Sequence, residues 1–499
     1  RYPEHRVWTP GFNEKFKAKY GYSPVSLYPA LWDSIGPETD AARVALFSFR
    51  SELMSDGFPR VVQEWAAANG VQSSGHAMGQ YHPQSTFMAG DAMKFYEHSD
   101  IPIMDSIHFY GHGRDGFKLT SSASYNYDKA LTSVEIYGNF QPYKGDPFNT
   151  EMLYRNGMEL FALGANVFIP HGMWYNPDRV GIPPLISDFN KEIAADLSEY
   201  NDWVARCAVL LREGRHVADI GVLYPIASMY AYAELDAPVG RKDRKIHPGL
   251  FVPEETDMNE LSVSLSGDAR RDFTYLHPEV LDDRCSIEGA TLKLNNEVNY
   301  EQYKILIIPG GEVIYWSNLQ KIKAFYDAGG TIIATSMLPV KSGEFGHDAD
   351  VQKTIKEIFG VDPILANKQG NIKNTNTAGG TAYFAPDFKK NRNVLTELLE
   401  MAHPEPDVRF VDTQPTIQTR EGMLLYLHKV KEGRNVYFFS NSTDEAIHTT
   451  VELRGAQQLE LWDPHTGATH SVESSIVGNY TVAPIQLDSL KSLFLLQKK

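Results

Sequence analysis

From residue 71 to residue 170, short apolar runs alternate with segments whose apolar residues are spaced as on one face of a helix. This alternation is typical of βα units that build a parallel sheet. The predicted strands cover residues 71–78, 101–108, 131–137 and 165–170, and the predicted helices cover residues 86–98, 117–129, 150–163 and 185–213. Four βα units make half of an eight-stranded (β/α) barrel. One more helix is expected over residues 40–69, where apolar side chains recur at helical spacing from Val44 to Trp65.

A second α/β region follows Gly214, a residue type that commonly ends a helix. Its predicted elements are a strand at 217–223, a polar excursion or linker at 235–260, a strand at 304–311, a helix at 318–328 and a strand at 331–335. A parallel sheet with alternating helices predicts a doubly wound, flavodoxin-like domain.

From about residue 416 the apolar residues recur with a period of two, as in strands with one buried face. The predicted strands cover residues 423–427, 436–439, 449–453, 459–462 and 492–496. Short strands separated by turn residues favour a β-sandwich. We therefore expect an α/β protein with a (β/α)-barrel region at 1–214, an α/β domain at 215–405 and a β-sandwich at 406–499.

Composition narrows the classes of partner. The formal net charge of -16 argues against nucleic acid and anionic membranes, which favour basic surfaces. Neither a membrane-spanning apolar run nor a signal peptide is visible in the sequence. The two cysteines, Cys207 and Cys285, are far apart and are expected to be buried free thiols rather than a disulfide or a metal site.

Polar side chains end each of the four predicted barrel strands, where the βα loops of a barrel converge on one mouth. They are His76 and Gln80, Asp105 and His108, Glu135 with Tyr137, and His171 followed by Trp174 and Tyr175. Glu135 lies in an apolar run where an unpaired carboxylate is costly to bury, so a functional role is favoured over a structural ion pair. Asp105 has the alternatives of capping a helix or pairing with an arginine. The histidines and aromatic residues have the alternative of packing in the core or in loops.

At these residues the chain resembles the α-L-rhamnosidases of glycoside hydrolase family 106 and related barrel enzymes of Bacteroidota. The resemblance is carried by Trp8-Thr9-Pro10, Tyr28-Pro29-Ala30-Leu31, Asp100-Ile101-Pro102, Ser121-Ser122-Ala123 with Val134-Glu135, His171-Gly172-Met173-Trp174-Tyr175, Leu210-Leu211-Arg212-Glu213-Gly214 and Trp462-Asp463-Pro464. It implies a catalytic role for Glu135 and a periplasmic or extracellular location. It also implies that further barrel strands, with a partner carboxylate, precede Arg1. Relatives tend to carry Glu where this chain has Gln80 and Asp105, which leaves the sugar specificity and a Ca²⁺ site open.

The middle region resembles the amidotransferase-like domain found inside several barrel glycosidases. An active glutaminase needs a nucleophilic cysteine on a strand-to-helix elbow, but Gly310 and Gly311 are followed by Glu312 and Val313. The domain is therefore expected to be structural, with a contact between copies of the chain as one possible role.

The leading hypothesis is a glycosidase that cleaves a terminal, rhamnoside-like sugar from a plant or algal polysaccharide. Glycosidic hydrolysis uses two carboxyl groups, for which Glu135 is the acid or base and Asp105 a second carboxylate or a metal ligand. His76, Gln80, His108 and His171 would bind sugar hydroxyls, and Trp174 and Tyr175 would stack on the ring. The alternatives are a uronidase or galactosidase-type enzyme, for which Arg114 or Arg179 would bind a sugar carboxylate, and a degenerate barrel that binds glycans without cleaving them.

Overall fold

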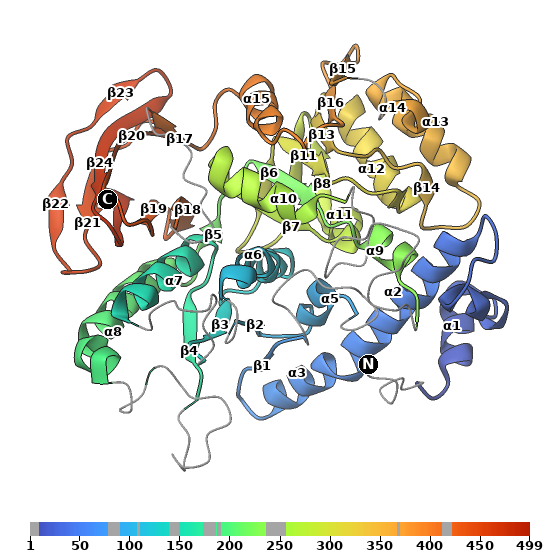
Figure 1. The fold of residues 1–499 in the computed structure, drawn as a ribbon, viewed down its shortest axis with the longest axis horizontal. Helices are drawn as coiled ribbons and strands as arrows, with labels where there is room; N and C mark the ends of the chain where they lie inside the picture. Colours follow the sequence, from blue (N-terminus) through green and yellow to red (C-terminus); the bar gives the residue numbers. More distant parts are fainter. Residues whose placement is uncertain are drawn as a thin grey trace.

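The computed structural model describes residues 9–77, 90–106, 110–138, 149–172, 186, 191–235, 256–366, 370–411 and 422–499. It is a mixed α/β structure in which helices and a small parallel sheet from the first part of the chain lie below a larger sheet, with the C-terminal strands at one side (Figure 1). None of the helices within these described ranges is long and apolar enough to cross a lipid bilayer.

The N-terminal sheet has four parallel strands in chain order, as the βα pattern predicts. They are β1 (Ser74–Gly75), β2 (Ile101–Asp105), β3 (Ser133–Ile136) and β4 (Val167–Pro170). The helices that follow them are α5 (Ala92–Tyr96), α6 (Tyr110–Asn126), α7 (Thr150–Ala162) and α8 (Lys191–Leu211). Parallel strands in chain order bring their carboxyl ends to one edge, so the polar strand ends share that edge.

The single helix expected over residues 40–69 is wrong. The chain forms α2 (Thr39–Gly57) and α3 (Pro59–Ala68), and the break falls at Phe58, because Pro59 lacks the N–H that would continue the helix. The spacing also misjudged burial, since Val44 and Phe47 lie in the core whereas Trp65 on α3 is 65% exposed. Before α2 come α1 (Phe12–Tyr20) and the 3₁₀ helix η2 (Val25–Leu31).

The middle sheet has six strands in the order β15-β16-β13-β11-β6-β7. β6 (Ile220–Leu223), β7 (Phe273–Leu276), β11 (Ile305–Ile308), β13 (Thr331–Thr335) and β16 (Thr381–Ala385) are parallel, and β15 (Ile372–Thr375) is an antiparallel edge. Numbered by sequence, the parallel strands run 2-1-3-4-5, which is the flavodoxin-like order.

Helices and short strands surround this sheet (Figure 1). The helices are α9 (Ile226–Tyr232), α10 (Met258–Val263) with the π-helix η4 (Ser264–Asp268), α11 (Pro278–Arg284), α12 (Trp316–Asp327), α13 (Asp348–Phe359), α14 (Pro363–Ala366) and α15 (Asn393–Ala402). The short strands are β8 (Cys285–Glu288), β9 (Thr291–Leu294), β10 (Glu301–Tyr303), β12 (Val313–Ile314) and β14 (Lys341–Ser342). The predicted excursion at 235–260 lies partly outside the described residues, and its described end contains the start of α10.

The strand predicted at 217–223 starts too early, because β6 begins only at Ile220 and a separate short strand precedes it. β5 (Arg215–His216) pairs with β18 (Leu424–Lys431) of the C-terminal part, and β6 pairs with β7 and β11 of the middle sheet. Residues 217–219 make the passage from one sheet to the other. The sequence pattern carries no mark of this change of sheet, because it reports burial and not which strand lies alongside.

Two antiparallel sheets form the C-terminal part. The large one has the order β22-β21-β25-β19-β18-β5, and the small one has the order β17-β20-β24-β23. Their remaining strands are β17 (Val408–Val411), β19 (Arg434–Asn441), β20 (Ile447–Arg454), β21 (Leu459–Trp462), β22 (Thr469–Ser471), β23 (Ser475–Val477), β24 (Tyr480–Leu487) and β25 (Lys491–Gln497).

The large C-terminal sheet is buried on both faces. On one face Leu425 and Phe438 belong to a hydrophobic cluster with α7 and α8, including Trp203. On the other face Tyr426 and Phe439 belong to a cluster with the small C-terminal sheet. Because side chains alternate along a strand, one face of these strands packs in each of the two clusters. The cluster with α7 and α8 holds the C-terminal part against the helices of the N-terminal sheet.

A buried cluster of four charged side chains lies where the three parts meet. His216 on β5 contacts Asp272 through Nε2 at 2.7 Å and Glu301 through Nδ1 at 2.6 Å, and Lys118 on α6 pairs with Asp272 at 2.5 Å. All four side chains are at most 7% exposed. Two cations face two carboxylates, so the burial of each charge is compensated.

The charged groups of this cluster shift one another's pKa values. Burial alone would lower the pKa of His216, but the carboxylates of Asp272 and Glu301 outweigh it, and the net effect raises that pKa. Burial alone would raise the pKa of Asp272, but Lys118 and His216 outweigh it and hold the pKa at about 2. The two carboxylates therefore favour the cationic form of the imidazole in the folded protein.

We expect His216→Gln to lower the free energy of unfolding by about 3–5 kcal/mol, because two buried carboxylates lose their shared cation. His216 binds its proton more tightly in the folded state than in the unfolded chain, where the pKa is about 6.5. Its contribution is therefore complete below about pH 6.5 and is lost as the pH rises through the raised folded pKa.

Urea unfolding at pH 6 and pH 9 measures this effect, with the exposed His470→Gln as the matched control. The wild type and the control should lose stability on the alkaline side, and His216→Gln should lose less. An equal alkaline loss in all three proteins contradicts the assignment.

Candidate active site

Three chemically active side chains meet at the carboxyl edge of the N-terminal sheet. Asp105 on β2 pairs in register with Glu135 on β3, and His76 follows β1 directly. One ligand atom from each of the three lies within 4.8 Å of the others. The predicted convergence of His76, Asp105 and Glu135 is therefore present in the structure.

The carboxylate of Glu135 lies between two imidazoles. Its Oε1 is 3.4 Å from Nδ1 of His171, and its Oε2 is 3.7 Å from Nε2 of His76. The side chain is 29% exposed, so solvent reaches it. Each oxygen of this accessible carboxylate thus has an imidazole nitrogen nearby.

The backbone holds Glu135 firmly. Its carbonyl oxygen accepts a hydrogen bond from the Ser106 amide at 2.8 Å, which continues the pairing of β2 with β3. The His171 amide donates to the Ile136 carbonyl at 2.7 Å on the other side. Groups on strand ends of a hydrogen-bonded sheet are positioned more accurately than groups on free loops.

One ring nitrogen of His76 has a defined protonation state. Its Nδ1 lies 3.1 Å from the Ala77 carbonyl oxygen, which can accept but cannot donate. Nδ1 therefore carries the proton, and Nε2 is the atom that faces Glu135. Nε2 is therefore the ring nitrogen on the Glu135 side, 3.7 Å from the carboxylate.

Tyr137 does not belong to this mouth, although the sequence places it at the end of the third strand. It is 3% exposed and packs with α7 and α8, where its hydroxyl bonds with that of Tyr200. Its φ of 71° turns the chain sharply two residues after Glu135. Nothing in the local pattern indicates this reversal.

Four predicted ligand-binding residues, Gln80, His108, Trp174 and Tyr175, lie outside the described residues, as does Arg179. Arg114 lies in α6, but its side chain is outside the described part. The site that the structure describes therefore consists of His76, Asp105, Glu135 and His171.

A Ca²⁺ ion does not fit the described donors. Calcium takes six to eight oxygen ligands, and His76, Asp105 and Glu135 supply two carboxylates and one imidazole. A nitrogen and two oxygens suit first-row transition metals better.

The cysteines offer no second active site in the middle sheet. Cys207 and Cys285 are both free and buried, as expected. Burial raises the pKa of the Cys285 thiol to about 12, so it is not a thiolate at neutral pH. After β11 the chain has Gly310, whose amide donates to Asp257 at 2.8 Å, and no thiol.

A sequence model of the α-L-rhamnosidase family, glycoside hydrolase family 106, matches residues 4–242 and 251–476. This match extends over most of the chain and includes all four residues of the site. The chain belongs to glycoside hydrolase family 106.

Two relatives of this family member share about a fifth of their aligned residues with it. A protein of Formosa agariphila named "Putative beta-glucuronidase" is 21% identical over 509 residues, which cover 98% of this chain and 37% of that protein. The rhamnosidase of Novosphingobium sp. PP1Y has a similar structure, with a TM-score of 0.70, 19% identity, and coverage of 99% of this chain and 43% of that one. The chain thus spans about two fifths of these relatives.

The fold is also similar to that of the beta-galactosidase from Bacillus circulans sp. alkalophilus. The TM-score is 0.65 at 13% identity, with 99% of this chain and 77% of that one covered. At this identity the likeness concerns the fold, and the chemistry of this family member has to be argued from its own side chains.

Asp105 and Glu135 are carboxylates at paired positions of neighbouring strands, and like charges placed opposite each other destabilise a sheet. We expect Glu135→Gln to raise the free energy of unfolding at pH 8, where imidazoles in general carry little charge, by a few tenths to about 1 kcal/mol. Urea unfolding beside the exposed Glu473→Gln checks this. Equal or lower stability than in the control contradicts it.

Proposed function

We propose that the chain carries the active site of a glycoside hydrolase that removes a terminal, α-L-rhamnoside-like sugar from a polysaccharide, with Glu135 as general acid or base. The supporting observation is the accessible Glu135 carboxylate, 3.4 Å from His171 and 3.7 Å from His76 at the carboxyl edge of parallel strands. Such a substrate favours a periplasmic or extracellular location. The N-terminal sheet is then half of a (β/α)8 barrel, and the two C-terminal sheets form a β-sandwich beside it.

The proton chemistry follows from the neighbours of Glu135. Departure of the sugar's leaving oxygen requires a proton, and activation of water requires a base. Because Nδ1 of His76 is held by a carbonyl oxygen, its Nε2 can give a proton to Glu135 or take one from it. His171 lies at the second oxygen and orients the carboxylate. Glu135 can thereby regain a proton from His76 between turnovers.

The Asp105 and Glu135 carboxyl groups lie closer together than those of an inverting pair. In inverting glycosidases the two carboxyl groups are about 6.5–9.5 Å apart to leave room for water, and in retaining enzymes about 5–5.5 Å. The facing oxygens of Asp105 and Glu135 are within 4.8 Å. An inverting outcome, which the family resemblance implies, therefore requires a further carboxyl group from another part of the protein.

A second candidate substrate is a uronic acid, because the Formosa agariphila relative carries a glucuronidase name. A uronidase needs a cation that pairs with the sugar carboxylate. The described neighbours of the Glu135 carboxylate are two imidazoles and one carboxylate, which suit a neutral sugar better.

We expect Glu135→Gln to reduce kcat/KM on an aryl α-L-rhamnoside by about 10²–10⁴-fold, because the amide cannot exchange the proton. Hydrolysis is followed by release of the aryl group, and sugar binding by calorimetry. Glu473→Gln, an exposed glutamate outside the site, should match the wild type. Near-normal turnover by Glu135→Gln removes Glu135 from the mechanism.

We further expect an aryl α-L-rhamnoside to be hydrolysed at least tenfold faster than an aryl β-glucuronide, because no arginine or lysine among the described residues contacts the Glu135 carboxylate. Initial rates of the full-length protein on the two substrates measure this ratio. Faster cleavage of the glucuronide favours the uronidase alternative, and cleavage of neither substrate favours a barrel that only binds glycans.

A further inference from the structure

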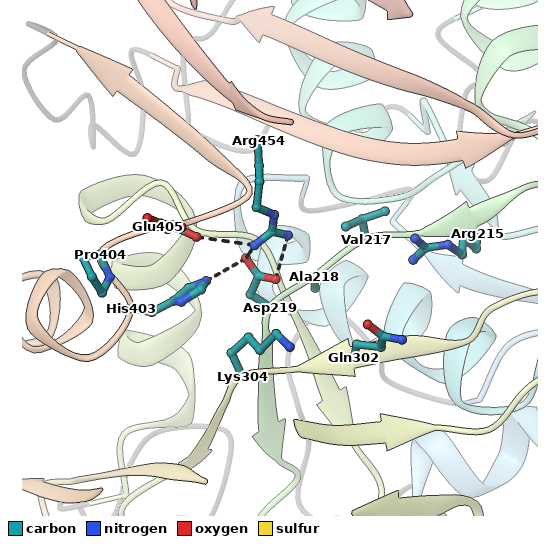
Figure 2. A pocket seen from close by; sticks show the side chains of 10 residues that line it. All are labelled: Arg215, Val217, Ala218, Asp219, Gln302, Lys304, His403, Pro404, Glu405 and Arg454. Atoms are coloured by element: carbon teal, nitrogen blue, oxygen red, sulfur yellow. Dashed lines mark hydrogen bonds and ion pairs between the residues drawn. The ribbon is translucent and has the colours of Figure 1, made fainter. Parts of the chain in front are cut away.

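A cavity of about 590 Å³ lies where the middle sheet meets the C-terminal sheets (Figure 2). Its wall is built by the passage from β5 to β6, by β10, by the segment after α15 and by Arg454 at the end of β20. None of the four residues of the Glu135 site lines it. The cavity is therefore separate from the proposed catalytic centre.

On one side of the cavity, the negative charge of Asp219 is paired with neighbouring side chains. Arg454 holds Asp219 with two hydrogen bonds of 2.8 and 2.9 Å, and Nε2 of His403 lies 3.0 Å from the same carboxylate. Burial alone would raise the pKa of Asp219, but His403 and Arg454 outweigh it and hold the pKa at about 2. Asp219 is thus a paired structural anion and does not attract a further cation.

Two other cations in the wall have no such partner. Within the described part of the chain, neither Arg215 nor Lys304 forms an ion pair. The Nε of Arg215 is buried without a hydrogen-bond acceptor, and its guanidinium stacks on Tyr300 at 4.5 Å from the ring centre. The Lys304 amine donates to the Thr291 hydroxyl at 2.8 Å, which leaves two of its protons available.

These two cations are directed at the same space. Figure 2 shows the Arg215 guanidinium and the Lys304 amine pointing toward each other, with the Gln302 amide beside them. The wall as a whole contains three cations, Arg215, Lys304 and Arg454, and two carboxylates, Asp219 and Glu405. The wall thus has one more of these positive groups than negative ones, in a chain whose net charge is -16.

We propose that this cavity binds the carboxylate or sulfate of an acidic saccharide, with Arg215 and Lys304 as its cationic ligands. Planar guanidinium pairs with such oxyanions through two parallel hydrogen bonds, and the Gln302 amide can bond a hydroxyl. The volume falls in the range of small-molecule sites, about 300–1,000 Å³. The oxyanion follows from the cavity itself, whereas the saccharide rests on the proposed function.

Calorimetric titration of the full-length protein with glucuronate, glucose 6-sulfate, glucose and inorganic sulfate tests the proposal. Both acidic sugars, or one of them, should bind at least tenfold more tightly than glucose. Arg215→Gln and Lys304→Gln should each weaken that binding about tenfold, and Lys353→Gln, an exposed lysine on α13, should leave it unchanged. Raising the salt concentration should weaken the binding in the wild type.

Binding of glucuronate alone assigns a carboxylate ligand, and binding of the sulfated sugar alone assigns a sulfate ester. Equal affinity for glucose, unchanged affinity in both variants, or no acidic sugar binding with a Kd below about 10 mM overturns the site. Inorganic sulfate binding as tightly as the acidic sugars overturns the saccharide assignment. Glu135→Gln should bind the acidic sugar as the wild type does. Loss of acidic-sugar binding can therefore be distinguished from loss of hydrolysis.

Discussion

The buried contact of His216 with Asp272 and Glu301 is the constraint on which the arrangement of the three parts depends. His216 lies on a strand of the large C-terminal sheet, Lys118 on a helix of the N-terminal sheet, and the two carboxylates beside the middle sheet. Buried charges are costly unless each finds its partner, so the geometry in which all four meet is strongly preferred over alternatives. The cluster specifies how the parts dock, and the apolar contacts supply most of the binding energy.

That docking also shapes the two sites. The large C-terminal sheet lies against α7 and α8, which pack behind the N-terminal sheet and keep its strands in register. The carboxyl edge of these strands presents Glu135 and its histidine neighbours to solvent. The passage from β5 to β6, beside the charged cluster, forms a wall of the acidic-sugar cavity. One set of interfaces therefore positions a candidate catalytic carboxylate and a separate cationic cavity.

Sequence patterns predicted where helices and strands form better than they predicted which sheet or core each one packs in. The strands at 331–335 and 459–462 have the predicted bounds, because periodicity reports which face of an element is buried. The four βα units occur in the predicted order, although β1 is shorter than the strand predicted at 71–78. The same signal could not show that β5 and β6 belong to different sheets, or that Trp65 is exposed. Both depend on what packs nearby.

The sequence by itself determined that polar groups end consecutive parallel strands, and hence that His76, Asp105 and Glu135 share one edge. Tertiary structure alone decided that His171 and His76 lie at opposite oxygens of Glu135, that Tyr137 turns into the core, and that Arg215 and Lys304 face one cavity. The physical reason is that strand order fixes which backbone ends are neighbours. Side-chain contacts between segments distant in sequence depend on the packing of the whole molecule.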